Sequence, residues 1–118
     1  MRRAAHLKLE VRRIGRASVV SACGDIDLST VAQAAEAMDA ARTDRGPVFL
    51  DLREVGFMDT SGLRLIIEEQ QRAAADGYRF AVLPGPPKVQ RLFEIAGLAG
   101  DERLFADPST LPAVGEGD

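Results

Sequence analysis

The sequence has very few of the residues on which metal sites, disulfides and catalytic triads depend. Its 118 residues include one cysteine, one histidine, one tyrosine and no tryptophan. A single cysteine excludes an intrachain disulfide, and with a single histidine it gives no basis for a Cys/His zinc site. His6 falls at the start of the first expected strand, where it supports no catalytic triad. We interpret Cys23, in a strand with a buried pattern, as a small core residue.

Long hydrophobic runs and a strong net charge are also missing. No apolar stretch approaches the roughly 20 residues that cross a bilayer, and Lys8 and Glu10 interrupt the N-terminal region that a signal peptide would need. The net charge of -3 gives no electrostatic reason to bind nucleic acid or an acidic membrane. We therefore predict a cytoplasmic protein with no membrane insertion and no direct nucleic acid binding.

What the chain does contain is a regular alternation of strand-like and helix-like segments. A hydrophobic fraction of 46% in 118 residues is enough for one domain with its own core. Alternating and 3.6-residue hydrophobic periods predict strands at 7–11, 17–23, 48–52, 78–83 and 102–105, and helices at 28–42, 60–76 and 88–97. The order β-β-α-β-α-β-α-β predicts an α/β fold with a mixed sheet, an opening hairpin and parallel crossovers. We place the domain at 1–106 and a flexible tail at 107–118.

Two loops follow predicted strands and are the expected functional loops, because such loops gather at the carboxyl ends of parallel strands. The first spans 24–29 and begins at Gly24, which we expect to end the second strand. The second spans 57–62, at the end of a loop that we predict from residue 53 onward. Either Asp27 or Ser29 is suited to cap the helix that follows the first loop.

Acidic residues mark these strand ends and raise one alternative. Asp25, Asp27, Asp51 and Asp59 would suit a magnesium site or a phosphoacceptor receiver domain. That interpretation requires an acid pair after the first strand, where the sequence has RRIGR, an acceptor Asp after the third strand, and a lysine late in the chain, where Lys88 lies on a helix. We disfavour it. A P-loop is also missing, because PGPPK lacks the spacing and the backbone donors of a phosphate cradle.

The segment DTSG, Asp59 to Gly62, carries the most specific chemistry in the chain. Asp, Thr and Ser are all good N-caps, yet one cap suffices, and Gly62 in a first helical turn costs up to about 1 kcal/mol relative to alanine. A hydroxyl at a helix N-terminus can also carry a phosphate, which the free N–H groups and the helix dipole stabilise. From the residues alone, a capping role and a phosphorylation role for Ser61 remain equally open.

Three blocks of the sequence resemble the STAS-domain anti-sigma factor antagonists. FLDLREVGFMDTSGLRLI resembles the strand, loop and D-S/T-S-G-L/I helix start of that family. VVSACGDIDLSTV resembles its strand running into G-E/D-L/I-D, and RLFEIAGL resembles its late helix. Together the blocks span about residues 7–106. The resemblance implies a STAS fold and a protein that is not an enzyme and has no cofactor.

The family's mode of action gives expectations for individual residues. The resemblance implies that the unphosphorylated protein binds an anti-sigma factor with serine kinase activity and so releases a sigma factor. It implies Ser61 as the phosphorylation site, with Thr60 as the alternative, and a serine phosphatase that removes the phosphate. The partner-binding residues are then Asp25, Asp27, Asp59, Thr60, Ser61 and Gly62. The main alternative is a constitutive STAS binding subunit of a transporter or stress-signalling assembly, without regulatory phosphorylation.

Overall fold

A mixed four-stranded sheet forms the centre of the molecule. The computed structural model describes residues 5–42 and 46–111. In chain order its elements are β1 (Leu7–Ile14), β2 (Ala17–Ile26), α1 (Val31–Ala41), β3 (Val48–Met58), α2 (Thr60–Asp76), β4 (Phe80–Leu83), α3 (Pro87–Ile95) and the 3-10 helix η2 (Pro108–Thr110). The strand order is β1-β2-β3-β4, antiparallel between β1 and β2 and parallel elsewhere. The predicted α/β fold with an opening hairpin is confirmed.

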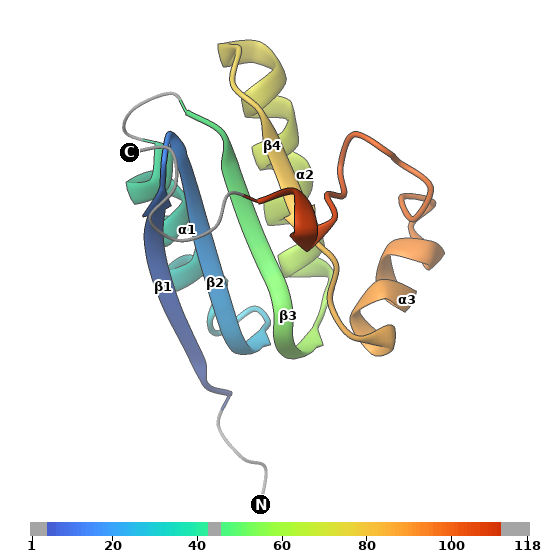
Figure 1. Ribbon diagram of the computed structural model, residues 1–118. Coiled ribbons are helices and arrows are strands. Elements are labelled where there is room, and N and C mark those ends of the chain that lie inside the picture. Colours follow the sequence, from blue (N-terminus) through green and yellow to red (C-terminus); the bar gives the residue numbers. More distant parts are fainter. Residues whose placement is uncertain (1–4, 43–45, 112–118) are drawn as a thin grey trace, which may run out of the picture.

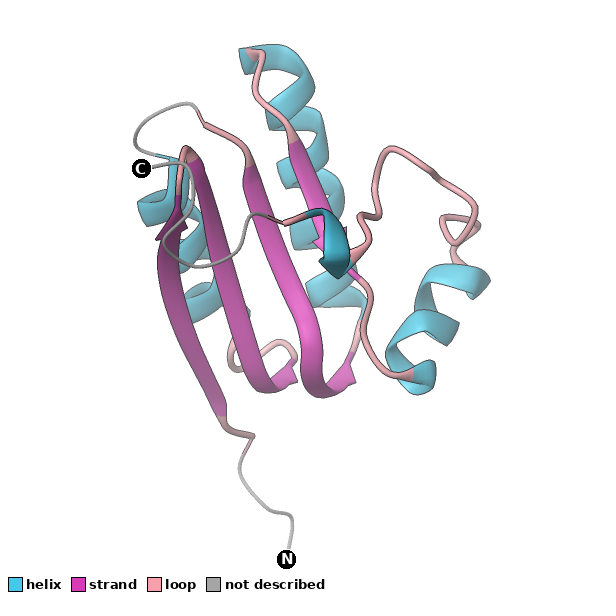
Figure 2. Ribbon diagram, in the orientation of Figure 1, coloured by secondary structure: helices cyan, strands magenta, loops and turns pink. Residues whose placement is uncertain are grey.

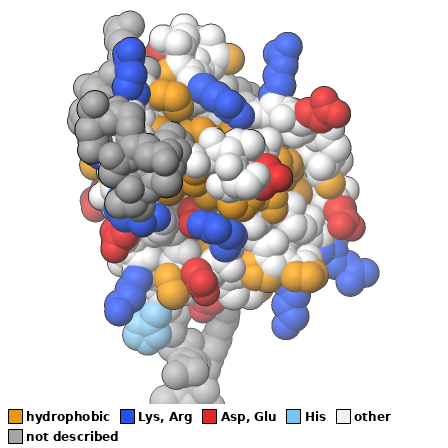
Figure 3. Space-filling view, viewed as in Figure 1, with side chains coloured by type: hydrophobic (Ala, Val, Ile, Leu, Met, Phe, Trp, Pro, Cys, Tyr) orange, Lys and Arg blue, Asp and Glu red, His pale blue; other side chains and the backbone are white. Residues whose placement is uncertain are grey.

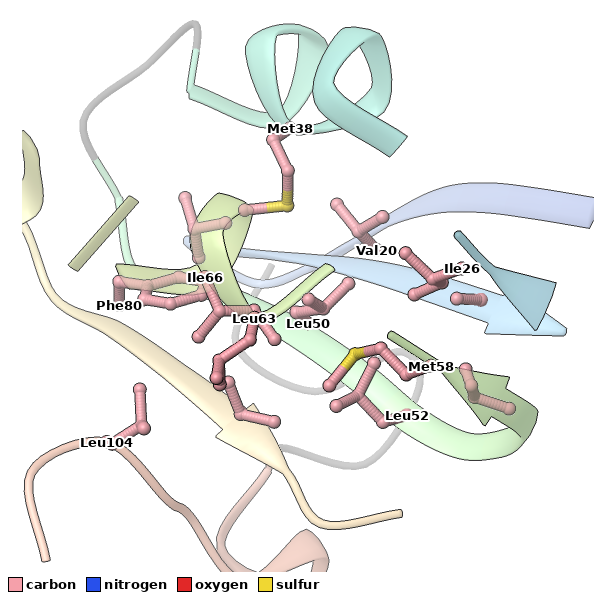
Figure 4. Close-up of a cluster of buried hydrophobic side chains, with 14 of the residues drawn as sticks. Val20, Ile26, Met38, Leu50, Leu52, Met58, Leu63, Ile66, Phe80 and Leu104 are labelled. Carbon is pink, nitrogen blue, oxygen red and sulfur yellow. The ribbon is translucent and has the colours of Figure 1, made fainter. Parts of the chain in front are cut away.

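The two faces of the sheet are covered differently. Helices α1 and α2 cover one face, whereas the segment that carries η2 crosses the other, and α3 lies beyond β4 (Figure 1; Figure 2). The main core lies between the sheet and the helices and includes Val20, Ile26, Met38, Leu50, Leu52, Met58, Leu63, Ile66, Phe80 and Leu104 (Figure 4). A smaller cluster on the opposite face contains Ile14, Ala17, Val19, Phe49, Ala81, Leu83 and Ala106.

Strands β2 and β3 are both longer than the sequence predicts. β2 does not end at Gly24 but continues to Ile26, and β3 includes residues 53–58, which we predicted as a loop. The reason is an irregular pairing between them, with register shifts between Ser21 and Cys23 and between Gly24 and Asp25. Such irregularities break the strict alternation on which strand prediction relies.

The last predicted strand, at 102–105, is wrong. Only an isolated parallel bridge joins Val82 to Phe105 there. The Asp101 carboxylate accepts hydrogen bonds from the amides of Arg103 and Leu104 and holds this stretch as a turn. The Val82 amide still donates to the Leu104 carbonyl at 2.7 Å, so the segment lies along β4 without forming a strand.

Two burial predictions also differ from the structure. Cys23 is exposed rather than a core residue, because its neighbour Ala22 occupies the core-facing position of β2 while Cys23 pairs with the exposed Lys8. Glu69, whose place opposite the apolar face of the predicted helix at 60–76 predicts an exposed side chain, is only 3% exposed. Its carboxylate accepts a hydrogen bond from Arg42 at 2.5 Å and another from the Tyr78 hydroxyl. Burial, followed by this contact with Glu69, raises the pKa of Tyr78.

Several sequence predictions concern residues outside the described ranges. Most of the predicted tail falls at 112–118, and part of the predicted break after the first helix falls at 43–45. Within the described part of the tail, Pro108–Thr110 form η2 and Leu111 packs against the smaller cluster. The domain boundary at residue 106 thus remains a prediction. In the described ranges, no helix has the length and apolar character needed to span a membrane.

Candidate functional site

The two loops predicted to be functional lie side by side. Ile26 at the end of β2 pairs with Met58 at the end of β3, and the Asp59 amide donates to the Ile26 carbonyl at 3.1 Å. Residues 25–30 and 57–62 therefore form one surface, which we call the Ser61 corner. It contains all six residues predicted to contact a partner, as expected for the carboxyl ends of parallel strands.

Helix α2 is capped by Asp59, not by either hydroxyl. Asp59 has extended backbone angles, and its Oδ1 accepts a hydrogen bond from the Ser61 amide at 2.8 Å. The Ser61 hydroxyl donates to the same Oδ1 atom. Since the carboxylate already does the capping, the Ser61 hydroxyl is not needed to satisfy a backbone amide. The structure thus removes capping as the reason for a serine at position 61.

The hydroxyls of α2 face a groove between α1 and α2. Thr60 is exposed and Ser61 is half-buried. The groove has a volume of about 530 Å³ and is lined by Leu28, Val31, Ala32, Ala35, Thr60, Ser61, Arg64, Leu65 and Glu68. Ser61 therefore lines a groove on the surface that a second molecule can contact.

Gly62 is required by packing beneath the helix start. A Cβ atom at this position would lie 2.6 Å from Met58 Cγ and 2.9 Å from Ile26 Cγ2. Both side chains belong to the buried core. The glycine therefore lets α2 approach the ends of β2 and β3 closely.

The start of α1 is built differently from that of α2. The cap position is Thr30, without a side-chain capping bond, so neither Asp27 nor Ser29 is the helix cap. Asp27 instead caps the preceding turn, where its Oδ1 accepts from the Ser29 amide at 2.9 Å and from the Ser29 hydroxyl at 2.6 Å. The hydrogen bond from the Ser29 side chain is the main cause that lowers the pKa of Asp27. Asp27 is therefore a charged, half-buried group at the corner.

Thr30 holds this turn in place from below. Its hydroxyl donates to the Asp25 carbonyl at 2.8 Å and accepts from the Asp27 amide at 3.0 Å. Thr30 is only 4% exposed, so the turn is anchored to the body of the domain. Both carboxylates of the loop are thus presented from a fixed backbone.

Exposed apolar side chains lie among the acids of the corner. Leu28 is 80% exposed, and Phe57, which pairs with Asp25 across the strands, is 50% exposed. Sequence reasoning missed both residues. The available signal was an apolar residue inside each loop, in DIDLST and GFMD, that fits no helical or strand period. A surface that combines acids with exposed apolar groups is suited to a protein partner.

The fourth acid, Asp51, does not belong to the corner. It lies within β3 and pairs with Ser21, whereas Asp25 pairs with Phe57 further along the same strand. Burial alone would raise the pKa of Asp51, but hydrogen bonds from Arg53 hold it below its usual value. Within the described residues, no group of three His, Cys, Asp or Glu side chains is arranged to hold a metal ion.

Comparisons with known proteins agree with this architecture. The sequence model of the family described as "Mlab, STAS domain" matches residues 9–106. An anti-sigma factor antagonist from Mycobacterium paratuberculosis superposes with a TM-score of 0.77 at 24% identity, covering 88% of this chain and 89% of that one. The unphosphorylated anti-sigma factor antagonist SpoIIAA gives 0.68 at 22% identity, covering 78% and 83%.

A third similar structure is that of a phosphorylated protein. The phosphorylated form of the Bacillus cell fate determinant SpoIIAA gives a TM-score of 0.61 at 22% identity, covering 79% of this chain and 85% of that one. At these identities the solved structures establish a shared fold. The search of curated proteins found no significant match.

Proposed function

Because the chain belongs to the STAS domain family, we propose that it is an anti-sigma factor antagonist switched by phosphorylation of Ser61. In its unphosphorylated form it binds an anti-sigma factor that has serine kinase activity, and so releases a sigma factor. The observation that carries this proposal is the Ser61 hydroxyl, which Asp59 frees from capping and which opens onto the groove between α1 and α2. The similar solved structures include antagonists, one of them described in a phosphorylated form.

The corner provides a recognition surface for the unphosphorylated state. Leu28 and Phe57 offer apolar contact area, while Asp25, Asp27 and Asp59 offer acceptors for basic or backbone donors of the partner. The Asp27 turn and the Asp59 cap fix these groups before binding, so little conformational entropy is lost in the complex. The surface that binds the partner is then the same surface that the partner kinase phosphorylates.

In this proposal, phosphorylation changes the charge of this surface and requires no refolding of the domain. The partner kinase transfers the γ-phosphoryl group of ATP to Ser61 Oγ, the hydroxyl proton is lost, and ADP leaves. The Ser61 hydroxyl can then no longer donate to Asp59, and a charge of about -1.5 to -2 is added beside three carboxylates. Repulsion and the cost of desolvating this charge oppose binding. A serine phosphatase restores the binding form.

In this proposal the chain itself is not an enzyme and uses no cofactor. It acts in the cytoplasm, and it reaches transcription through its partner rather than by contact with nucleic acid. The phosphoryl group comes from the partner's ATP, so a purified preparation of this chain alone is expected to hydrolyse neither ATP nor esters.

A partner capture followed by phosphosite mapping tests the proposal. The chain is used to capture its partner from the native cell, and the complex is incubated with ATP. We expect a kinase-type anti-sigma factor in the capture and a phosphate on Ser61 in the mass spectrum. Modification only at Thr60, or capture of a partner with no phosphorylation of either hydroxyl, would contradict the switch.

The second candidate is a constitutive STAS subunit of a transporter or stress-signalling assembly. One observation favours it: Ser61 already has a partner in Asp59, so its polar role is complete without a phosphate. In that case the corner would bind its partner whether or not ATP is present, and the capture experiment would return an assembly without kinase activity.

A further inference from the structure

The two edge strands of the sheet differ in their backbone neighbours. At the β4 edge, the segment around Phe105 lies alongside, and Val82 exchanges backbone hydrogen bonds with Leu104 and Ala106. At the other edge, β1 is the terminal strand, and no strand from the described residues pairs with its outer side. A terminal strand of eight residues is a ready template for a further strand.

The pairing of β1 with β2 decides which of its backbone groups point outward. The Asp25 amide donates to the His6 carbonyl at 2.8 Å at one end of the hairpin, and the Ser18 amide turns toward Pro47 of the β3 side at the other. With an unbroken register between these points, the even-numbered residues of β1 bond to β2. Leu7, Leu9 and Val11 therefore direct their amides and carbonyls away from the sheet.

The side chains of β1 divide into an apolar and a charged row. Leu7 and Leu9 are half-buried and pack against the main core on the helix side, where Val11 is 40% exposed. Lys8, Glu10 and Arg12 alternate in sign on the other side, and Figure 3 shows acidic and basic side chains interspersed along this edge. Charges on edge strands often prevent pairing, but charges of alternating sign can complement a copy of themselves.

We infer that β1 pairs antiparallel with β1 of a second copy of this chain, about a two-fold axis at Leu9. This register places Leu9 opposite Leu9, and Leu7 opposite Val11, so the outward backbone groups of these residues bond to one another. It also places Lys8 of each copy opposite Glu10 of the other. Glu10, which already pairs with Arg12 of its own strand at 3.2 Å, then lies between two cations. The dimer thus gains two ion pairs, and the exposed Val11 gains an apolar neighbour.

Neighbouring registers are less favourable. An axis at Glu10 would oppose Glu10 to itself and Lys8 to Arg12, which places like charges in direct contact. An axis at Val11 would match Glu10 with Arg12 but would set the apolar Leu9 against Arg13. The register at Leu9 is the one that satisfies both rows of side chains.

The helix layer accommodates this dimer. Helix α1 lies across both β1 and β2, so in a continuous sheet the two copies of α1 would be about two strand spacings, or roughly 10 Å, apart. That separation is the usual distance between packed helices. Because β2 separates β1 from the strand that leads to Ser61, the inference does not rest on the proposed function.

Sedimentation equilibrium over about 10 µM to 1 mM tests the dimer, the range expected for a small interface. We expect a reversible dimer for the wild-type protein. Lys8→Glu should raise its dissociation constant about thirtyfold, and Glu10→Lys should have a similar effect, because each turns both ion pairs into repulsive pairs. Lys88→Glu makes the same charge change on the exposed start of α3 and should leave the dimer unchanged.

Mixing the two reversed variants gives the decisive result. Lys8→Glu and Glu10→Lys chains are complementary to one another, so an equimolar mixture should dimerise within a few-fold of wild type. Protection of the Leu7, Leu9 and Val11 amides from hydrogen exchange should rise with protein concentration. A wild-type chain that stays monomeric at about 1 mM, or a dimer that is indifferent to Lys8→Glu, would overturn the inference.

Discussion

The groove between α1 and α2 has two ends that are built in opposite ways. At the open end lie Thr60, Ser61 and the exposed Leu28. At the other end, Glu69 is buried between Arg42 and Tyr78, and all of its carboxylate oxygens are bonded. A hollow beside Arg42 and Glu69 shares the lining residues Ala35, Leu65 and Glu68 with the groove beside Ser61, so the two are continuous.

The difference between these ends suggests that the Glu69 end stabilises the fold and the Ser61 end contacts a partner. The buried Arg42–Glu69–Tyr78 contact joins the end of α1 to the middle of α2 and fixes the angle between the helices. In the proposed switch, the Ser61 end would then keep its shape while its charge changes. A surface that must accept and lose a phosphate without refolding needs such a fixed support, because bistable packing would otherwise convert a local charge into a wider rearrangement. Four predictions test this separation.

The largest effect is expected at the closed end, from Glu69→Ala. Removing the carboxylate leaves the Tyr78 hydroxyl without its buried partner and leaves the 16% exposed Arg42 side chain with only the exposed Asp39 as an ion-pair partner. Breaking a buried pair on one side costs about 3–5 kcal/mol in the free energy of unfolding. Urea denaturation measures the loss. The neighbouring exposed Glu68→Ala is the control, with an expected change within about 0.5 kcal/mol.

The next effect is expected at the open end, in binding rather than stability. Ser61→Asp should weaken binding of the kinase partner about a hundredfold, equivalent to about 3 kcal/mol, because it adds a charge beside the Asp59 carboxylate. Ser61→Ala should bind as wild type and unfold at nearly the wild-type urea concentration, since Asp59 still caps α2. Calorimetric titration gives both affinities. If Ser61→Ala instead unfolds the domain, the serine is structural and the comparison fails.

A smaller effect is expected from pH at the closed end. Tyr78 is the only tyrosine, so its ionisation can be read directly by ultraviolet absorbance. Its raised pKa means that the folded state favours the protonated hydroxyl. This contribution to stability is complete below the unfolded value of about 10 and is lost as pH rises toward the folded value. Tyrosinate should appear at higher pH in native than in urea-unfolded protein, and equal titration curves would show that the contact with Glu69 is absent.

The smallest effect on folding is expected from Asp27→Asn. The amide oxygen can still accept from Ser29, so the urea midpoint of unfolding should stay close to that of the wild type. Loss of the charge should nevertheless reduce partner binding or the rate of Ser61 phosphorylation. The lowered pKa of Asp27 also predicts how stability depends on pH. Its stabilising contribution is present above the unfolded pKa near 4 and disappears as pH falls through the folded pKa. Wild-type binding and phosphorylation in this variant would limit the interface to Thr60 and Ser61.

Much of the architecture could be predicted from the sequence because its periodic segments are clear. The hairpin, the three helices and the buried third strand follow from hydrophobic spacing, and the DTSG segment marks the corner by its residue types alone. The strand from 53 to 58 could not be predicted, because Val55 and Met58 are buried at a spacing of three residues rather than two. Local spacing does not reveal a register shift against a neighbouring strand.

The details of the corner depended on contacts that spacing does not encode. Sequence offered several capping residues, and only the backbone at Asp59 decides that this carboxylate caps α2. The packing reason for Gly62 depends on Met58 and Ile26, which come from two different strands. The burial of Glu69 depends on Arg42 at the end of another helix. Each outcome is set by tertiary structure and overrides the local pattern.

The hydrogen bond from Asp59 to Ile26 has a consequence for the order of folding. The β1–β2 hairpin closes over a two-residue turn, whereas β2 and β3 are separated in the sequence by the whole of α1. Contacts between distant segments form late because the entropy of closing the loop must be overcome first. The surface around Ser61 is therefore completed only when the parallel pair has formed. A partner that recognises this surface would ignore nascent and partly folded chains, so that only a finished domain enters the signalling cycle.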